Sequence, residues 1–153
     1  MKISVIKIVA IMFLITGCGF KVVNQSELIS FKIADVSISG DNRISYIIKN
    51  KLLPYTTNNT KKTINLEIKI KKNKIIKEKN IKNEITKFKI LIVAVVEYNK
   101  IDTAKFEISE TGDYTVTSQY SETLNNERKL VKILSENIAE KIIEELILKA
   151  DDL

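Results

Sequence analysis

The sequence predicts an α+β domain, a two-layer sandwich in which two helices cover one face of about four mixed strands. The first observation is an alternation of apolar and polar residues, which indicates strands near 31–38, 63–72 and 85–98. The second is a short helical pattern at 42–53, between the first two of these strands. The third is a long helical pattern at 123–149, near the end of the chain. The expected element order is β-α-β-β-β-α.

The first strand is expected to begin at Phe31, with a bulge near Ala34 and Asp35, where the alternation breaks once. Gly40 follows this strand and is expected to end it. A helix joins the first strand to the second, so the right-handed crossover rule predicts that these two strands are parallel neighbours. The remaining strands are expected to be antiparallel.

The first helix is expected from Asn42 to Leu53, with Asp41 or Asn42 as its cap. Its apolar residues recur at helical spacing, which predicts a buried stripe made of Ile44, Ile47, Ile48 and Leu52. Pro54 is expected to end the helix, because proline has no amide proton and disfavours helical backbone at the residue before it.

The second strand, Thr63 to Lys72, has the clearest alternation in the chain. Its apolar side chains point one way and its polar side chains the other, so one face belongs to the core and one to solvent. The lysine- and asparagine-rich segment 72–83 fits either a continuation of this strand or a long hairpin loop, and the sequence does not separate the two.

A third strand is expected from Ile85 to Tyr98, and a fourth from Ala104 to Ser109 that resumes at 114–120 after a turn or bulge around Gly112. The centre of the third strand is apolar on both faces. Helices cover only one of these faces, so Leu91, Val93 and Val95 are expected on the uncovered one, as a partner surface. The final helix has Leu130, Leu134, Ile138, Ile142 and Leu146 four residues apart.

The start of the chain has the pattern of a bacterial lipoprotein signal peptide. Lys2 and Lys7 precede an apolar run, and the small residues Thr16 and Gly17 precede Cys18. We expect residues 1–17 to be removed and Cys18 to carry diacylglycerol and an N-acyl chain. An uncleaved membrane helix is disfavoured, because the run is shorter than the roughly 20 residues that span a bilayer. A cysteine that follows the run by chance is the other alternative.

Residues 18–30 then form a lipidated leader, and 31–150 a single α+β domain. Gly19 and Phe20 follow the cysteine without the aspartate that often retains bacterial lipoproteins at the inner membrane. The sequence therefore favours the outer membrane, with the domain on its periplasmic side.

Charge is distributed unevenly along the chain. Residues 61–89 contain eleven lysines and three glutamates, whereas seven basic and thirteen acidic residues follow from Ile90 onward. On an exported protein, a basic stretch favours phosphate-bearing lipid head groups over nucleic acid as the partner. The alternative is a solvated strand face in a chain that is rich in lysine throughout.

Composition argues against an enzyme or a metal site. The chain has no histidine, so imidazole cannot act as a ligand, base or triad member. With four glycines, one of them in the signal peptide, the chain cannot build a phosphate-cradling loop. A hydrolase would have to use Glu107 with Glu110 or Asp102, but their spacing on an alternating strand is typical of a surface. We expect no catalytic residue, no metal and no cofactor other than the lipid on Cys18.

Several of these features together resemble the LptE family, the lipopolysaccharide-assembly lipoproteins of Gram-negative outer membranes. They are the start Cys18-Gly19-Phe20, a strand and short helix with Arg43 near its start, the segment Tyr114–Tyr120, and a final helix with Leu130, Ala139, Ile142 and Leu146. The resemblance covers essentially all of the mature chain in element order, and its sequence matches are concentrated at the two ends.

The resemblance implies a lipoprotein that plugs the LptD β-barrel, helps it assemble and binds lipopolysaccharide. Lys69, Lys71, Lys72 and Lys74 do not align with a lipid-contacting motif of the family, so their assignment to lipopolysaccharide rests on charge and strand phase. Strand phase puts the first two on one face and the last two on the other, so only a twisted strand end would present all four together. The alternative function is a periplasm-facing auxiliary subunit of another envelope transporter, which predicts an apolar pocket.

Overall fold

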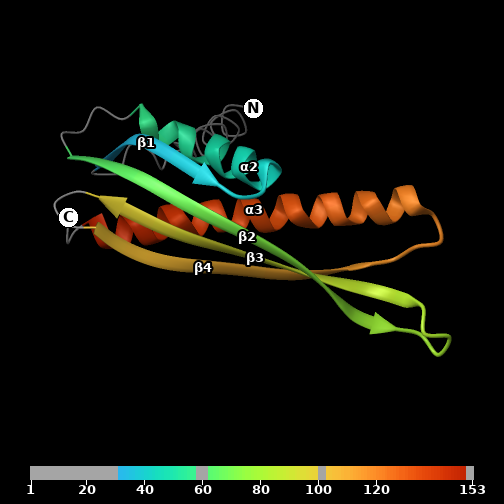
Figure 1. Cartoon of the computed structure of the whole chain (residues 1–153). Coiled ribbons are helices and arrows are strands. Elements are labelled where there is room, and N and C mark those ends of the chain that lie inside the picture. The colour runs from blue at the N-terminus through green and yellow to red at the C-terminus, as the bar shows by residue number, and fades with distance from the viewer. Residues whose placement is uncertain (1–30, 58–61, 100–102, 151–153) are drawn as a thin grey trace, which may run out of the picture.

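The computed structural model describes residues 31–57, 62–99 and 103–150. Their elements are, in chain order, β1 (Phe31–Ser39), α2 (Asn42–Leu52), the 3-10 helix η2 (Leu53–Thr56), β2 (Lys62–Lys79), β3 (Ile85–Asn99), β4 (Thr103–Thr115) and α3 (Tyr120–Ala150). This order confirms the predicted α+β class (Figure 1). The predicted signal peptide, Cys18 and leader lie outside the described residues, so the statements about them stay predictions.

The four strands form one mixed sheet in the order β1-β2-β3-β4. β1 pairs with β2 in parallel, and the other two pairings are antiparallel, as the crossover rule predicted. The pairing of β1 shifts register between Ile33 and Asp35, which confirms the predicted bulge.

The helix α2 begins at Asn42, as the sequence predicted. The Asp41 side chain accepts hydrogen bonds from the backbone N–H groups of Arg43 and Ile44 and so caps the helix. Ile44, Ile48 and Leu52 are fully buried against the sheet. Pro54 does not stop the helical path at once, because it lies in the first turn of η2, where no backbone amide donor is needed. The same turn buries Tyr55.

The segment whose structure the sequence left open continues as strand. β2 extends over 18 residues to Lys79, and it pairs with β3 from Asn65 to this end. Pairing with β1 ends at Ser39 and Lys69, so the second half of β2 has a free edge. The far end of the β2–β3 hairpin consequently projects beyond the helices (Figure 1).

The prediction of a turn or bulge around Gly112 is wrong, because β4 runs unbroken from Thr103 to Thr115 and pairs with β3 in one register. Gly112 pairs opposite Ile90, and its missing side chain makes room for Leu130 of α3. The strand also ends earlier than predicted. The last backbone bond to β3 runs from Val116 N–H to Thr86 O, and Thr117 then bonds the Thr123 hydroxyl, which turns the chain into the helix.

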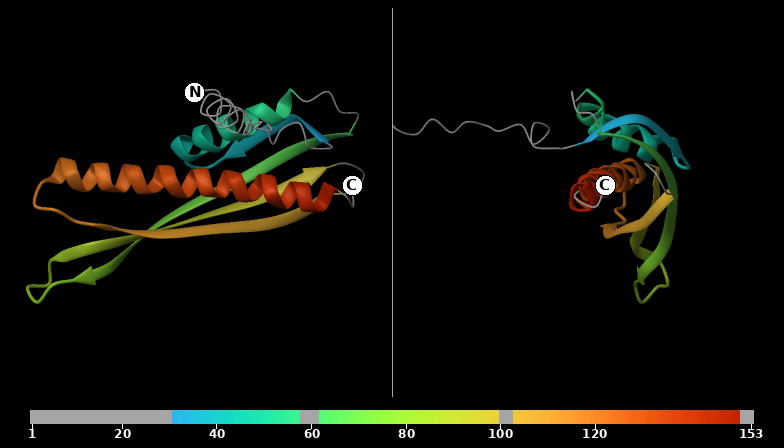
Figure 2. Two further views of the ribbon diagram at one scale, coloured as in Figure 1. Left: turned by 180° about the vertical axis from the view of Figure 1, so that it is seen from behind. Right: turned by 90° about the vertical axis from the view of Figure 1, so that its left-hand side faces the viewer.

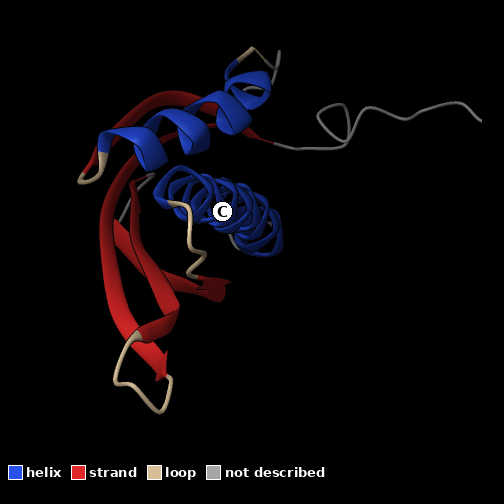
Figure 3. Ribbon diagram, turned by 90° about the vertical axis from the view of Figure 1, so that its right-hand side faces the viewer, coloured by secondary structure: helices blue, strands red, loops and turns tan. Residues whose placement is uncertain are grey.

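The helix α3 begins at Tyr120, three residues before the predicted start, and packs on β4, α2 and β3. Seen from behind, it runs along β3 and β4, with α2 beside it (Figure 2). An end-on view shows that the twisted sheet curves around α3 (Figure 3). The four-residue apolar repeat is confirmed, because Leu134, Ile138, Ile142 and Leu146 are buried and Leu130 is partly buried. The core therefore lies between the concave side of the sheet and the two helices.

The tight exit from β1 gives the first testable prediction. Gly40 has φ of +120°, and a Cβ there would lie 2.3 Å from the backbone oxygen of Ile70. We expect Gly40→Ala to lower the free energy of unfolding by about 2 kcal/mol or more, measured by chemical denaturation. At Gly112 an added Cβ would come too close only to Leu130 Cδ1, at 2.6 Å, and this end of the side chain can rotate, so the control Gly112→Ala should cost less. Equal losses would contradict the strain at Gly40.

Candidate functional site

The sheet has one face that neither helix covers, here called the outer face. On β3 the residues alternate: Ile90, Ile92, Ala94 and Val96 are buried beneath the helices, whereas Leu91, Val93 and Val95 point the other way and are half-buried. The three predicted partner-surface residues therefore form one apolar row on the outer face. No described helix lies over this row (Figure 3).

Two of the predicted lysines lie directly beside this row. In the pairing of β2 with β3, Lys69 is opposite Val95 and Lys71 is opposite Val93. On the other side, β4 places the polar residues Glu107, Ser109 and Thr111 opposite the same three apolar residues. The outer face is thus an apolar row with lysines along one side and short polar or acidic side chains along the other.

Lys69 is part of a surface charge cluster. Its ammonium lies 3.1 Å from Glu67 and 3.5 Å from Glu97, and Lys105 reaches the same Glu97 carboxylate at 3.7 Å. The Glu67 carboxylate, and to a lesser extent that of Glu97, raises the pKa of Lys69. Lys71 makes no ion pair within the described part of the chain. A ligand anion would therefore compete with carboxylates at Lys69 but not at Lys71.

Lys72 and Lys74 lie on the opposite face, beside the helices, where they pair with Ile92 and Ile90 of β3. Lys72 makes an ion pair of 3.0 Å with Asp41, the cap of α2. Partial burial opposes ionisation of Asp41, but the bonds from Lys72 and from two backbone amides outweigh it, so the pKa of Asp41 is lowered. The structure thus brings two predicted lysines to the apolar row and places the other two elsewhere.

Lys74 belongs to a cluster that the sequence did not reveal. Its ammonium donates to Glu127 of α3 at 2.7 Å and lies 4.3 Å from the centre of the Phe88 ring. The Tyr114 hydroxyl donates to the same Glu127 oxygen at 2.8 Å, and its ring stacks on Phe88. The cluster thus joins β2, β3 and β4 to the first turns of α3.

In this cluster the charged forms of Glu127 and Lys74 stabilise each other. Burial works against the charges on Glu127 and Lys74, but their hydrogen bond, together with that of Tyr114, lowers the pKa of Glu127 and raises that of Lys74. Burial, with the bond to Glu127, raises the pKa of Tyr114. Lys74 and Glu127 are 53 residues apart, so no local pattern in the sequence could have paired them.

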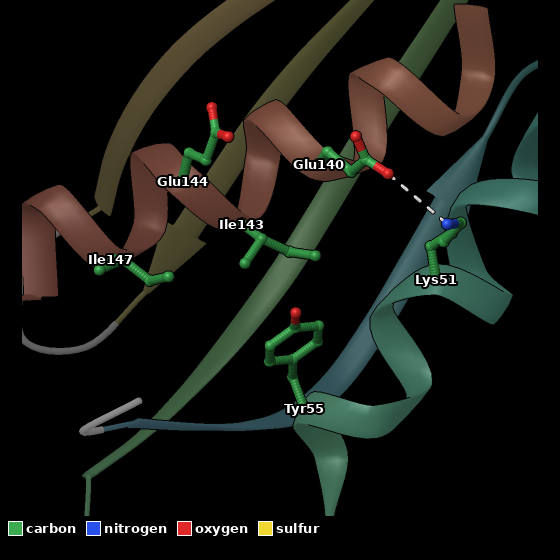
Figure 4. A pocket seen from close by; sticks show the side chains of 6 residues that line it. All are labelled: Lys51, Tyr55, Glu140, Ile143, Glu144 and Ile147. Atoms are coloured by element: carbon green, nitrogen blue, oxygen red, sulfur yellow. Dashed lines mark ion pairs between the residues drawn. The ribbon is translucent and has the colours of Figure 1, made fainter. Parts of the chain in front are cut away.

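A groove lies between α2 and α3 at the end where η2 packs. Its volume is about 430 Å³, and its lining comes from Lys51, Tyr55, Glu140, Ile143, Glu144 and Ile147. Tyr55 points toward Ile143, and an ion pair of 3.6 Å joins Lys51 to Glu140 across the groove (Figure 4). Half of the lining residues are charged, which makes this groove less apolar than the pocket that a transporter subunit for soluble ligands would need.

The carboxylates considered for a hydrolase do not form a pair. Glu107 lies on the outer face opposite Val95, whereas Glu110 lies on the helix face and bonds Lys141. Asp102 is outside the described residues. Within the described ranges, no group of three or more histidine, cysteine, aspartate or glutamate side chains could hold a metal ion. Nor does this part of the chain contain a helix with the length and apolar character needed to cross a membrane.

The fold is shared with several bacterial lipoproteins of known structure. Rare lipoprotein B from Shewanella oneidensis matches with a TM-score of 0.60 at 11% identity, over 77% of this chain and 97% of that one. Lipoprotein B from Nitrosomonas europaea matches at 0.61 and 12%, over 88% and 94%. The minor lipoprotein from Acinetobacter baumannii matches at 0.55 and 12%, over 78% and 91%.

At this level of identity the likeness shows a common fold. The sequence matches no protein-family profile, and no curated protein matches it.

The cluster around Glu127 predicts a pH dependence. The pKa of Glu127 is lowered from its ordinary value of 4.5, so its ionised form stabilises the fold above that pH, and the contribution is lost as the pH falls through the folded pKa. We expect Glu127→Gln to reduce the free energy of unfolding by about 1 kcal/mol at neutral pH and to flatten its acid dependence. Denaturation curves at several pH values measure this. The control is Glu122→Gln, at an exposed position on the same helix. If the stability of Glu127→Gln fell with pH as steeply as that of the unchanged protein, the prediction would be contradicted.

Proposed function

We propose that this protein is an outer-membrane lipoprotein, lipidated at Cys18 on the periplasmic side, that plugs and helps assemble an LptD-type β-barrel and binds lipopolysaccharide in transit to the outer leaflet. It acts without catalysis, by binding. The observation that carries the proposal is the apolar row Leu91, Val93 and Val95 on a sheet face that no described helix covers. The fold shared with rare lipoprotein B and minor lipoproteins supports an envelope lipoprotein.

The outer face has about the size that a stable interface needs. β2, β3 and β4 run together over the 13 residues of β4, which corresponds to a planar area on the order of 600 Å². A standard interface buries about 800 Å² on each partner, so this face can supply most of one. Apolar residues at the centre with polar residues around them are the usual composition of such a surface.

Lysines beside the apolar row suit the lipid part of the proposal. Lipopolysaccharide offers acyl chains and phosphates together, and the row next to Lys69 and Lys71 offers apolar side chains and ammonium groups at the spacing of adjacent strands. Lys72 and Lys74 are held by Asp41 and Glu127 instead, and they contribute to the fold. Lipid binding is therefore proposed at Lys69 and Lys71, on the outer face.

A periplasm-facing auxiliary subunit of another envelope transporter is the second candidate. Its ligand would bind in the groove between α2 and α3, but half of the residues that line this groove are charged, whereas this function predicts an apolar pocket. Depletion of the protein separates the two: normal lipopolysaccharide at the cell surface would favour the transporter subunit.

Partner capture tests the barrel proposal. We expect Val93→Asp to abolish recovery of a barrel protein when the lipidated chain is affinity-purified from detergent-solubilised outer membrane, because it places a charge in the middle of the apolar row. Ile133→Asp is the matched control, since Ile133 is an exposed apolar residue on α3. Circular dichroism checks that both variants are folded. Recovery of no barrel even with the unchanged protein would contradict the proposal.

A comparison of the two lysine pairs tests the lipid site. We expect Lys69→Ala with Lys71→Ala to weaken binding of lipopolysaccharide in vitro by about tenfold, the effect of losing roughly 1.4 kcal/mol of charge-assisted contact. Lys72→Ala with Lys74→Ala should mainly lower the free energy of unfolding, because it breaks two ion pairs between the sheet and the helix layer. Unchanged binding by the first pair would remove the outer face from the lipid site.

A further inference from the structure

The far end of the β2–β3 hairpin is a separate structural feature, here called the arm (residues 75–87). Pairing with β4 stops at Lys87 and Thr115, apart from one further bond from Val116 N–H to Thr86 O, and pairing with β1 stops much earlier. Beyond Glu78 and Lys87 the arm therefore consists of β2 and β3 alone. It projects past the beginning of α3 (Figure 1). Its tip is therefore accessible from all sides.

Apolar side chains on the arm are exposed on both faces and at the tip. Ile75 lies on the outer face and is 53% exposed, whereas Ile76 lies on the opposite face and is 48% exposed. Ile81, in the turn at the tip, is fully exposed. A groove on a partner protein would select one apolar side of the arm, but these residues surround it.

The turn satisfies its own backbone. The Asn80 side-chain oxygen accepts the backbone N–H groups of Lys82 and Glu84, each at 2.9 Å. The Asn80 N–H donates to Glu84 O, and the Asn83 N–H donates to Asn80 O. With these four N–H groups bonded internally, the turn loses little when it leaves bulk water. Ile81 is thus presented at the end of a well-ordered turn.

Cations flank the exposed isoleucine. Lys79 and Lys82 lie on either side of the tip, and neither makes an ion pair within the described residues; Lys79 bonds only the side chain of Asn83. Lys77 and Lys87, further back, are held by Asp113 and Glu78. Glu84, also in the turn, accepts a bond from the Asn80 amide. The tip therefore presents an apolar side chain with two available ammonium groups.

We propose that the tip of the arm inserts into the head-group region of an anionic phospholipid bilayer. Ile81 enters the boundary between head groups and acyl chains, while Lys79 and Lys82 remain at the level of the phosphates. Insertion stays shallow, because the free backbone edges of the arm could not be satisfied in hydrocarbon. One apolar side chain and two lysines bind weakly, so the contact acts as an addition to another attachment. The inference does not rest on the proposed barrel partnership.

A tryptophan at the tip tests this contact. The chain has no native tryptophan, so Ile81→Trp introduces a single fluorophore. In the full-length lipoprotein reconstituted into vesicles of phosphatidylcholine with phosphatidylglycerol, we expect a blue shift of the emission and loss of intensity with brominated lipids. Ile133→Trp is the matched control, at an exposed isoleucine on α3, and should show neither effect.

The inference would be overturned by no shift at position 81, by an equal shift at position 133, by a shift that occurs only with lipopolysaccharide micelles, or by an equal shift on vesicles of pure phosphatidylcholine. In the Ile81→Trp background, Lys79→Ala with Lys82→Ala should reduce the shift on anionic vesicles. A shift unchanged by these two substitutions would overturn the assignment to an anionic surface.

Discussion

The antiparallel register of β2 against β3 is the constraint on which the other features depend. Side chains alternate between faces along both strands, so a slip of one residue would exchange every buried residue for an exposed one. In the observed register Ile68 and Val96, both fully buried, meet beneath the helices. The same register puts Lys71 next to Val93 on the outer face and Lys72 next to Ile92 on the helix face. Core, partner surface and lysine positions are thus set by one alignment.

Ion pairs at the margin of this core join the helix layer to the long second strand. Lys72 bonds the cap of α2, and Lys74 bonds Glu127 near the start of α3, so two successive core-facing positions of β2 hold the two helices. These pairs are partly exposed, and each adds on the order of 1 kcal/mol at most to what apolar burial supplies. Their main effect is on position, because they fix where each helix meets the strand beyond the last buried isoleucine. Lys72 and Lys74, which the sequence suggested as lipid ligands, thus hold the helices against the sheet.

Local patterns in the sequence were sufficient for the type of each element. Period-two alternation located the second strand, four-residue spacing located α3, and the break at Ala34 and Asp35 located the bulge. The sequence could not show how far β2 extends, because lysine and asparagine suit an exposed strand and a loop equally. It misplaced a turn at Gly112, where a glycine serves close approach of Leu130. Of the candidate site, the apolar row and its two adjacent lysines followed from strand phase, whereas the cluster of Lys74, Glu127, Tyr114 and Phe88 arises from contacts between distant segments.

The parallel pairing of β1 with β2 also has a mechanical consequence. The described chain enters the sheet at Phe31, and β1 pairs with β2 from there to Ser39. A force applied ahead of Phe31 and directed along β1 loads the hydrogen bonds of this pairing together, in shear, whereas a force across the strand would break them one at a time. Phe31 and Ile33, both buried, resist the same displacement by packing. A tether that is attached before this strand and pulls along it therefore loads the edge of the sheet in the direction in which that edge is strongest.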